Sequence, residues 1–468
     1  MAEATERRFD LNIEKILEGW ETCHAVREVI GNGLDEQVLT NSKDVEISKD
    51  RQSVWHIRDF GRGLKYDHLT QNENQEKLKN PSRVIGKFGV GLKDALATLN
   101  RHKIKVLIRS KYGHITLGQT AKHGFPDVVT LHAIVNPPAD PSFVGTDVAL
   151  DGVSNADVAA AKNFFLKFSN QSVLEETSYG QILKTTPEEK SRIYVTGMLV
   201  AEEENFAFSY NITSLTATMR KALNRERTNV GRTAYTDRVK QMLLASNADA
   251  VADTLASDLQ KLEVGTNHDE VKWMDVAVHA CQILNASRKV VFVTANDLNT
   301  FRDAIDHAQS DGMKIVTVPE NIKESLRGIT DLKGNPVRDL GVYQKEWAQS
   351  FEFKFVSPER LTASERNVFE QRVRIASLIG GLPKKVKHIK VSETMRPDFV
   401  TGTITHGVWD DASNSIIILR KQLVSLPDFA ATLLHEIAHA KTGYDDVSRE
   451  FENALTEMLG QVAASGLA

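Results

Sequence analysis

Two histidines and a glutamate stand together near the end of this 468-residue chain, in the run TLLHEIAHAKTG. On a helix, His435 and His439 are one turn apart and share a face, at a spacing that one zinc ion can bridge. Glu436 lies beside them and could take a proton from the water that attacks a peptide bond. Apolar neighbours predict that this helix is buried, and it follows the strand-like run SIIIL. The alternative is a chance match of the motif on an ordinary helix.

A third zinc ligand must come from elsewhere in the chain. Gly443 is expected to end the first helix, and Asp446 resembles the N-cap of the next one. In an antiparallel helix pair, Glu452 lies about as far beyond the turn as the histidines lie before it, so we expect Glu452 to be the ligand. The rival is Asp445, six residues after His439, a spacing that resembles metzincin-like sites. Asp446 and Glu450 are assigned cap and surface roles, and two further residues are candidate oxyanion stabilisers, His406 and Tyr444.

A second constellation lies in the run REVIGNGLDE, near the other end of the chain. On a helix, Glu28, Asn32 and Asp35 project from one face. A carboxylate and an amide one turn apart could hold a water and a divalent cation side by side. Mg²⁺ prefers oxygen ligands and keeps several waters, so one asparagine oxygen and the phosphates of a nucleotide would suffice. The alternative is an amphipathic helix that presents its polar face to solvent.

Two glycine-bearing turns follow this helix. In RDFGRG, Asp59 ends a strand and is followed by Gly61 and Gly63. The run VIGKFGVGLKDAL leads into a second helix and contains Gly86, Gly89, Gly91 and Lys93. Glycines let backbone N–H groups approach phosphate oxygens, the helix N-terminus favours an anion, and a lysine adds charge. Each motif alone could be a tight turn.

In this order, the three motifs resemble the N, G1 and G2 boxes of the GHKL ATPases, the gyrase, heat-shock chaperone, histidine kinase and MutL group. The resemblance covers roughly residues 15–150 and implies a Bergerat ATP-binding sandwich with residues 64–85 as the ATP lid. It makes Glu28 the general base, Asn32 the Mg²⁺ ligand, and Asp59 the acceptor for the adenine amino group. Thr146, in GTDVAL, matches the strand threonine that supports this aspartate.

Several basic residues follow in the run ALNRERTNVGR. In gyrase- and MutL-like members of the family, a second domain reaches a lysine or arginine back to the γ-phosphate. Arg225, Arg227 and Arg232 are therefore candidate sensors that would stabilise charge on the transferred phosphoryl group. The usual QTK-type loop is absent, which leaves the choice open. The alternative is a solvated basic helix end.

Residues 361–468 resemble minimal gluzincin peptidases, in which an edge strand pairs with an extended substrate. The element pattern as a whole predicts an α+β multidomain protein. It has a GHKL sandwich (1–175), a transducer-like α/β domain (186–287), an α/β connecting domain (288–356) and a small zincin-like domain (357–468). Within these we expect a helix over Ile13–Gln37, strands between Ile104 and Leu150, a β-α-β unit over Lys289–Pro319 and a helix over Glu365–Ile379.

The composition limits the class of protein. The chain is 41% hydrophobic and 26% charged, which is typical of a folded globular protein rather than a disordered one. Its net charge of −4 disfavours a constitutive nucleic-acid coat. With Cys23 and Cys281 as its two cysteines, it has no disulfide framework and no cysteine-based zinc site is expected. No apolar run reaches the roughly 18 residues of a membrane span, and the start lacks a signal-peptide core, so a cytoplasmic location is expected.

These observations lead to one functional hypothesis and one rival. The first is an ATP-gated metallopeptidase that uses ATP, Mg²⁺ and Zn²⁺, forms an ATP-dependent homodimer and cleaves a protein substrate. The rival is an ATP-driven chaperone or clamp with a non-proteolytic zinc site. Family analogy allows association with DNA, but no residue pattern supports it. No membrane partner is expected.

Overall fold

The computed structural model describes residues 7–11, 17–70, 77, 84–86, 91–186, 188–223, 230–261, 265–396, 405–444, 446 and 448–467. The protein is a mixed α and β molecule with several sheets, which confirms the expected multidomain class in its coarse form. It forms two compact units, Met1–Leu284 and Asn285–Ala468. Among the described residues, no helix is both long and apolar enough to cross a membrane.

The first unit begins with a seven-stranded sheet in the order β1-β6-β5-β4-β7-β3-β2, in which every neighbouring pair is antiparallel. Its strands are β1 (Arg7–Asp10), β2 (Glu46–Lys49), β3 (Trp55–Arg58), β4 (Lys105–Ser110), β5 (Gly113–Lys122), β6 (Phe125–Asn136) and β7 (Thr146–Asp151). The strands predicted between Ile104 and Leu150 are therefore confirmed. In the central strand β4, buried positions alternate with less buried ones, and in β7 the first five residues are buried, as expected for the inner part of a covered sheet.

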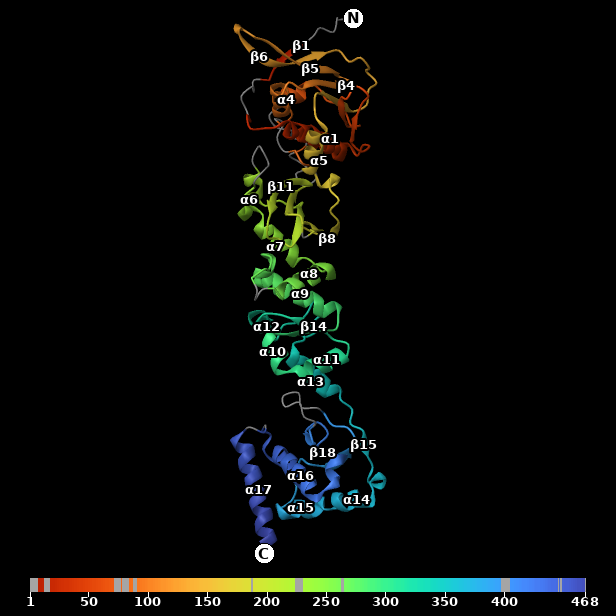
Figure 1. Ribbon diagram of the computed structural model, residues 1–468, viewed down its shortest axis with the longest axis vertical. Coiled ribbons are helices and arrows are strands. Elements are labelled where there is room, and N and C mark those ends of the chain that lie inside the picture. Colours follow the sequence, from red (N-terminus) through yellow and green to blue (C-terminus); the bar gives the residue numbers. More distant parts are fainter. Residues whose placement is uncertain are drawn as a thin grey trace. The chain divides into compact units, whose positions relative to one another are not determined.

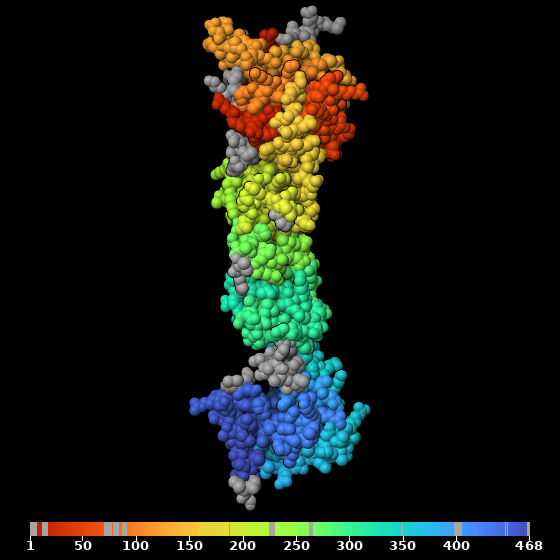
Figure 2. All heavy atoms as spheres, in the orientation of Figure 1, coloured from red at the N-terminus to blue at the C-terminus, as the bar shows by residue number. Residues whose placement is uncertain are grey.

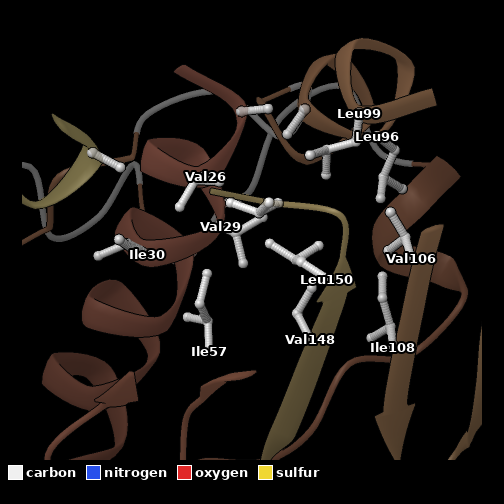
Figure 3. Packing of buried hydrophobic residues seen from close by; sticks show 14 of the residues in the cluster. Val26, Val29, Ile30, Ile57, Leu96, Leu99, Val106, Ile108, Val148 and Leu150 are labelled. Atoms are coloured by element: carbon white, nitrogen blue, oxygen red, sulfur yellow. The ribbon is translucent and has the colours of Figure 1, made fainter. Parts of the chain in front are cut away.

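Three helices cover one face of this sheet: α1 (Thr22–Thr40), α4 (Gly91–Arg101) and α5 (Asn155–Asn163) (Figure 1). A fourth, short helix, α2 (Asp67–Thr70), lies in the segment predicted as the ATP lid. Figure 3 shows how apolar side chains of α1 and α4 point toward those of β3, β4 and β7. Burying them removes apolar surface from water at about 25 cal/mol per Å², which holds the helices carrying the predicted motifs against the sheet.

The first helix is shorter at its start than the sequence predicted. We expected it from Ile13, but α1 begins at Thr22, after Glu21. The reason is a turn: Leu17 has a left-handed φ of 55°, and the chain bends before Trp20, whose N–H donates to the Leu17 carbonyl. Glu21 then caps the helix by accepting from the backbone of its first turn. Residues 12–16 lie outside the described part of the chain.

A second sheet completes the first unit, with five strands in the order β11-β10-β12-β9-β8. They are β8 (Val173–Thr177), β9 (Gly180–Lys184), β10 (Ser191–Val195), β11 (Met198–Glu203) and β12 (Phe208–Ile212). The helices that follow are α6 (Ala217–Ala222), α7 (Thr236–Leu244), α8 (Asp249–Leu259) and α9 (Met274–Ser287). The transducer-like domain was expected to start at residue 186. The sheet instead begins at Val173, because the hairpin of β8 and β9 adds to the edge of β12.

The second unit starts with the predicted β-α-β pattern. Strands β13 (Val290–Val293) and β14 (Lys314–Thr317) are parallel, which confirms this prediction. The helices of this part are α10 (Ala295–Thr300), α11 (Arg302–Ser310), α12 (Glu320–Leu326) and α13 (Leu340–Ser350). Its core is made by the buried face of β13 against α11 and α13.

The remainder of the second unit carries the histidine motif. Its four-stranded sheet has the order β15-β16-β18-β17. The strands are β15 (Phe355–Val356), β16 (His388–Ser392), β17 (Gly407–Asp410) and β18 (Ser415–Leu419). The helices are α14 (Ala363–Glu370), α15 (Arg372–Leu378), α16 (Leu426–Thr442) and α17 (Arg449–Leu467). The helix predicted over Glu365–Ile379 is thus two helices that meet at Gln371.

Helix α16 has clear start and stop signals. The Ser425 side chain accepts from the Asp428 N–H at the N-terminus, and Gly443 closes the other end with a φ of 73°, as predicted. The apolar side of α16 packs on β18 and on α17, whose dark-blue atoms lie alongside the preceding elements in Figure 2. The two caps fix where the histidine pair sits on this helix.

Candidate functional site

Glu28 is buried on α1 and held by its neighbour. Nη2 of Arg27 lies 2.9 Å from Glu28 Oε1, and the Arg27 guanidinium is enclosed between the rings of Trp20 and Phe164, each 5.1 Å away. The second carboxylate oxygen faces the first residue of α4, since a Cβ on Gly91 would overlap Glu28 Oε2. The predicted general base and the predicted phosphate turn are therefore adjacent.

Asn32 and Asp35 lie on the same face of α1, as predicted, and both contact a lysine. Lys77 Nζ lies 2.7 Å from Asp35 Oδ2 and 3.1 Å from Asn32 Oδ1. Asp35 also accepts from the backbone N–H groups of Ile85 at 2.5 Å and Gly86 at 2.7 Å. Asp35 thus fixes the start of the glycine segment, while the Asn32 oxygen already faces a cationic group. That geometry fits a site for Mg²⁺.

Asp59 is buried at the end of β3, beside Thr146 of β7. The N–H groups of Gly61 and Thr146 donate to its Oδ1 at 2.9 Å and 3.3 Å. Burial raises the pKa of Asp59, and the bonds from Gly61 and Thr146 oppose that rise. A Cβ on Gly33 would come within 3.9 Å of the Asp59 side chain, so α1 passes close to this carboxylate. Thr146 is therefore a direct neighbour of Asp59, and the adenine-binding role of the two residues stays a prediction.

Of the remaining residues of the predicted nucleotide site, some are described by the structure and others are not. Gly63 has a φ of 86° and packs near the Gly145 carbonyl, so only a residue without a Cβ adopts this turn easily. Lys93 is buried in the first turn of α4. Gly89 lies outside the described residues, and so do two of the candidate sensors, Arg225 and Arg227.

The third candidate sensor, Arg232, is engaged within the second sheet. Its Nη2 lies 2.5 Å from Asp269 Oδ2, its Nη1 lies 3.7 Å from Glu203 Oε2, and its guanidinium covers the Phe206 ring at 4.6 Å. Arg232 is thus paired with two acidic side chains in this structure, and its role as a γ-phosphate sensor stays a prediction.

Sequence reasoning missed two contacts around the nucleotide motifs. Arg62, inside the first glycine turn, donates to Glu36 from its backbone N–H, Nε and Nη2, each at 2.9 Å. In the second sheet, Thr196 Oγ1 donates to the Val84 carbonyl at 3.3 Å, directly before the glycine segment. The left-handed φ of Thr196, 48°, marks the tight turn between β10 and β11. The run VTG was the available signal for that turn.

The two histidines of α16 converge with an aspartate. His435 Nε2 and His439 Nε2 are 3.2 Å apart, and Asp446 Oδ1 lies 3.0 Å from the first and 2.8 Å from the second. Ligand atoms around one tetrahedral zinc, at bonds of about 2.0–2.1 Å, are separated by about 3.3 Å. The three groups therefore fit one zinc ion and leave a fourth position for another ligand.

The prediction that Glu452 is the third ligand does not agree with its position. Glu452 is exposed on α17, whereas Phe451 faces the histidines, with ring centroids 4.9 Å from His435 and 4.4 Å from His439. Glu452 lies at the predicted distance along α17 but on a different face from the one that meets the histidines, because one residue turns a helix by about 100°. The Asp446 carboxylate, which we had assigned to a cap, occupies the third position. The rival Asp445 lies outside the described residues.

Helix α17 begins at Arg449, and Ser448 takes the capping role that was predicted for Asp446. The Phe451 N–H donates to Ser448 Oγ at 3.2 Å. Of the two candidate oxyanion stabilisers, His406 and Tyr444 are both exposed. The Tyr444 carbonyl, however, accepts from His439 Nδ1 at 2.9 Å. This bond sets the tautomer of His439, so that its Nε2 is the metal-facing nitrogen.

Glu436 lies behind the histidine pair, and it is 6% exposed. Burial raises its pKa to about 7, while His439 and the Trp409 N–H lower it. Gly407 makes room for it: a Cβ there would lie 2.9 Å from Glu436 Cγ and 3.0 Å from its Oε1. Both Trp409 and Gly407 belong to β17, the edge strand of the sheet. This four-residue strand was not predicted, yet it forms one wall of the site.

A second group of possible metal ligands lies at the start of α1 and was not expected. Glu21, Cys23 and His24 each offer a ligand atom within 4.8 Å of the others. The Glu21 N–H donates to His24 Nδ1 at 3.1 Å, as part of the helix cap. Burial raises the pKa of the Cys23 thiol, which disfavours the thiolate that a metal needs. Cys23 and Cys281 are both free thiols, as predicted.

Comparison with known proteins gives relatives from one organism. Residues 156–249 match the family described as the Mycoplasma pneumoniae MPN635 N-terminal domain. An uncharacterized protein of Mycoplasma pneumoniae is 37% identical over 244 residues, which cover 51% of this chain and 98% of that protein. Another uncharacterized protein of the same organism is 23% identical over 349 residues, covering 69% of this chain and 96% of the relative.

Proposed function

We propose that this chain, which belongs to the family of the 37% identical Mycoplasma pneumoniae protein, is an ATP-driven conformational switch that controls a zinc-dependent peptidase. The proposal extends the GHKL resemblance of the first unit and the gluzincin resemblance of the last residues. The single observation that carries it is the convergence of His435, His439 and Asp446 beside the buried Glu436. The nucleotide motifs add a second, independent support.

In the ATP half, Glu28 orients the attacking water with the oxygen that Arg27 does not hold. Asn32 Oδ1 is the protein ligand of Mg²⁺, which would neutralise charge on the phosphates. Asp59 accepts from the adenine amino group, and this gives selectivity because guanine presents no donor at that position. The glycine segment lets backbone N–H groups approach the phosphates at the start of α4.

In the peptidase half, His435, His439 and Asp446 would hold a zinc ion, and Glu436 would accept the proton of the attacking water. A zinc ion bound there would act as a Lewis acid toward water and the substrate carbonyl. Glu436, with its pKa raised to about 7 by burial, accepts a proton from water and returns it to the leaving amine. The carbonyl of Tyr444 keeps His439 in the tautomer that this metal binding needs.

The substrate of this half is an extended peptide. Strand β17 pairs with β18 on one side and ends the sheet on the other, so its outer edge can accept another strand. The Trp409 N–H of that strand donates to Glu436, which keeps the carboxylate at the edge where the peptide would lie. An unfolded or mobile segment of a protein fits this edge better than a folded surface does.

The switch itself rests on contacts inside the first unit. Thr196, in the turn between β10 and β11, donates to Val84, and the next residues, Ile85 and Gly86, donate to Asp35. A movement of the glycine segment on ATP binding would therefore displace the turn between β10 and β11 of the second sheet. The proposal also contains an ATP-dependent homodimer, which the GHKL resemblance implies. Light scattering with and without a non-hydrolysable ATP analogue tests whether the dimer forms.

The rival function is an ATP-driven chaperone or clamp whose zinc site is not proteolytic. A metal that only stabilises a fold has no use for a buried carboxylate beside it. Glu436 is such a carboxylate, and it lies on the same turn of α16 as the two histidines. The peptidase is therefore the preferred form of the proposal.

The first experiment compares the full chain with Glu436→Gln. We expect both proteins to hold about one zinc per chain by metal analysis, and the variant to lose cleavage of a quenched fluorescent peptide library. His435→Ala is the matched control and should lose zinc as well as cleavage. Unchanged proteolysis in Glu436→Gln would refute the peptidase assignment.

The second experiment tests the ATP half with Glu28→Ala. The variant should stop ATP turnover, measured by phosphate release, and still bind ATP, measured by calorimetry. Asp59→Asn should weaken binding itself, because the adenine acceptor is changed. Continued turnover in Glu28→Ala would remove Glu28 from its role.

A further inference from the structure

Lys77 joins two residues of the nucleotide motif on α1 from a position more than forty residues along the chain. Its Nζ contacts Asp35 Oδ2 at 2.7 Å and Asn32 Oδ1 at 3.1 Å, at separations of 42 and 45 residues. The side chain of Lys77 is 12% exposed and that of Asp35 is 1% exposed. A lysine this buried requires an acidic partner, so the contact is a specific one.

The hydrogen bonds of Asn32 fix which of its atoms meets the lysine. Asn32 Nδ2 donates to the Glu28 carbonyl at 2.9 Å. Its Oδ1 therefore accepts from Lys77, which has donors and no acceptor. This oxygen is the atom that the proposed function gives to Mg²⁺. The lysine ammonium thus stands beside the very ligand that the metal needs.

Asp35 is held differently. Its two oxygens also accept from the N–H groups of Ile85 and Gly86, so the carboxylate keeps backbone partners whatever Lys77 does. A Cβ on Gly86 would lie 2.5 Å from Asp35 Oδ2 and 2.8 Å from Lys77 Nζ, which puts the ammonium against the predicted phosphate turn. Lys77 can therefore leave Asn32, remain near Asp35 and meet a phosphate oxygen.

We infer that Lys77 is the built-in counter-cation of this site and competes with Mg²⁺ for Asn32 Oδ1. Mg²⁺ enters with the nucleotide and displaces the ammonium from Asn32, and the ammonium turns to the phosphates. When Mg²⁺ is scarce, Lys77 takes its place in compensating the charge of ATP. The inference rests on the proposed ATP function and concerns how strongly that function depends on Mg²⁺.

The test measures the dissociation constant of ATP by calorimetry, with the full chain, in magnesium-free buffer and in buffer with MgCl₂. The ratio of the two constants is, by linkage, the factor by which ATP binding strengthens Mg²⁺ binding. We expect this ratio to be at least about tenfold larger in Lys77→Met than in the natural protein, the size of one charge-assisted hydrogen bond. The loss should lie mainly in the magnesium-free constant.

Three comparisons make the result decisive. Lys77→Arg keeps the cation and should keep the small ratio, and Lys111→Met, at an exposed lysine in the turn between β4 and β5, should not change it. Lys77→Gln keeps a donor for Asp35 without the charge and should behave like methionine, which guards against a folding defect. An unchanged ratio in Lys77→Met and Lys77→Gln overturns the inference while the ATP function stands. Absence of ATP binding by the natural protein in both buffers overturns the two together.

Discussion

Gly407 and Gly91 both lie against an acidic side chain on which the proposed chemistry depends. A Cβ on Gly91 would overlap Glu28 Oε2, and a Cβ on Gly407 would lie 2.7 Å from Thr432 Cγ2 and 2.9 Å from Glu436 Cγ. In both cases the absent side chain lets a glutamate lie close to the backbone of another element. Each glycine therefore has a role in the position of one reactive group.

Gly407→Ala tests this role at the metal site. The added methyl should displace Glu436, reduce peptide hydrolysis by at least about tenfold and cost about 1–3 kcal/mol of stability. Steady-state cleavage and the urea midpoint measure the two effects. The control is Gly460→Ala in α17, where a Cβ meets nothing within 4 Å and a helix gains up to about 1 kcal/mol. Equal activity in the two variants would contradict the role of Gly407.

At this scale the sequence predicted local relations well and distant ones poorly. The histidine pair and Glu436 follow from spacing on one helix, and the structure keeps them together. The third group depended on how α17 packs on α16. The stripe of Phe451, Ala454 and Met458 leaves Glu452 exposed on the other side of α17, whereas Asp446, which is also exposed, contacts both histidines. Helical phase between two elements cannot be read from either element alone.

The turn between β10 and β11 is the element that joins the second sheet to the nucleotide motifs. The Leu166 N–H donates to the Gly197 carbonyl at 2.8 Å, and Asn211 Oδ1 accepts from the Gly197 N–H at 2.8 Å. The turn is thus fixed on both sides, and Thr196 extends from it to Val84. An element fixed this firmly transmits a displacement rather than absorbing it.

Thr196→Ala tests the contribution of this turn. Loss of the hydroxyl removes the bond to the Val84 carbonyl, and ATP affinity should fall about two- to tenfold, the range of one neutral hydrogen bond. Thr196→Ser keeps the hydroxyl and should bind ATP as the natural protein does. Calorimetric titration of both variants gives the comparison. If serine and alanine bind equally, the bond does not support the glycine segment.

The pair of Arg420 and Glu365 joins α14 to the segment between β18 and α16. Nε and Nη2 of Arg420 lie 2.8 Å and 2.9 Å from the two oxygens of Glu365, and these bonds lower the pKa of Glu365 from 4.5 to about 2. A carboxyl group whose pKa is lowered in the folded state stabilises the fold at pH values above its usual pKa. That stability is lost as the pH falls from about 4.5 toward 2.

Glu365→Gln should therefore flatten the acid part of the stability profile. We expect the urea midpoint of the second unit to fall between pH 5 and about pH 2.5 in the natural protein and to change less in the variant. Glu370→Gln, an exposed glutamate of the same helix, should leave the pH dependence unchanged. A steeper profile in Glu365→Gln would reverse the assignment of the pair.

Element prediction succeeded where patterns were long and capped. Helix α16, with Gly443 at its end, and the parallel pair of β13 and β14 matched the expectation. Short elements were missed: β17 has four residues, GVWD, and too few positions to establish an alternation. The hairpin of β8 and β9 was missed because VLEET and GQILK are short and mix polar and apolar residues; of the two, β8 is the edge strand.

At the scale of the whole molecule, each candidate site lies within one of the two compact units. The nucleotide motifs belong to Met1–Leu284, and the histidine cluster belongs to Asn285–Ala468, each with its own buried core. The boundaries of the four predicted domains inside these two units stay predictions. Composition and motif order were sufficient to predict more than one core, but not where the sheets begin.

We expect two separable thermal transitions in the full chain. Mg-ATP should raise the midpoint of one, and removal of zinc by a chelator should lower the midpoint of the other, because each ligand stabilises only the unit that binds it. Differential scanning calorimetry measures both, and Asp446→Asn should remove the effect of the chelator alone. A single transition that moves with both ligands would mean that the units unfold as one.

The origin of Asp446 has a consequence for the life of the protein during synthesis. The two histidines emerge from the ribosome on α16, but the aspartate reaches them only when the connection is closed by α17, with Phe451 against both rings. A nascent chain that has not yet made α17 therefore lacks the third member of the candidate metal cluster. Under the proposed function, cleavage begins only after α17 has formed, which protects the unfolded segments of the same chain during synthesis.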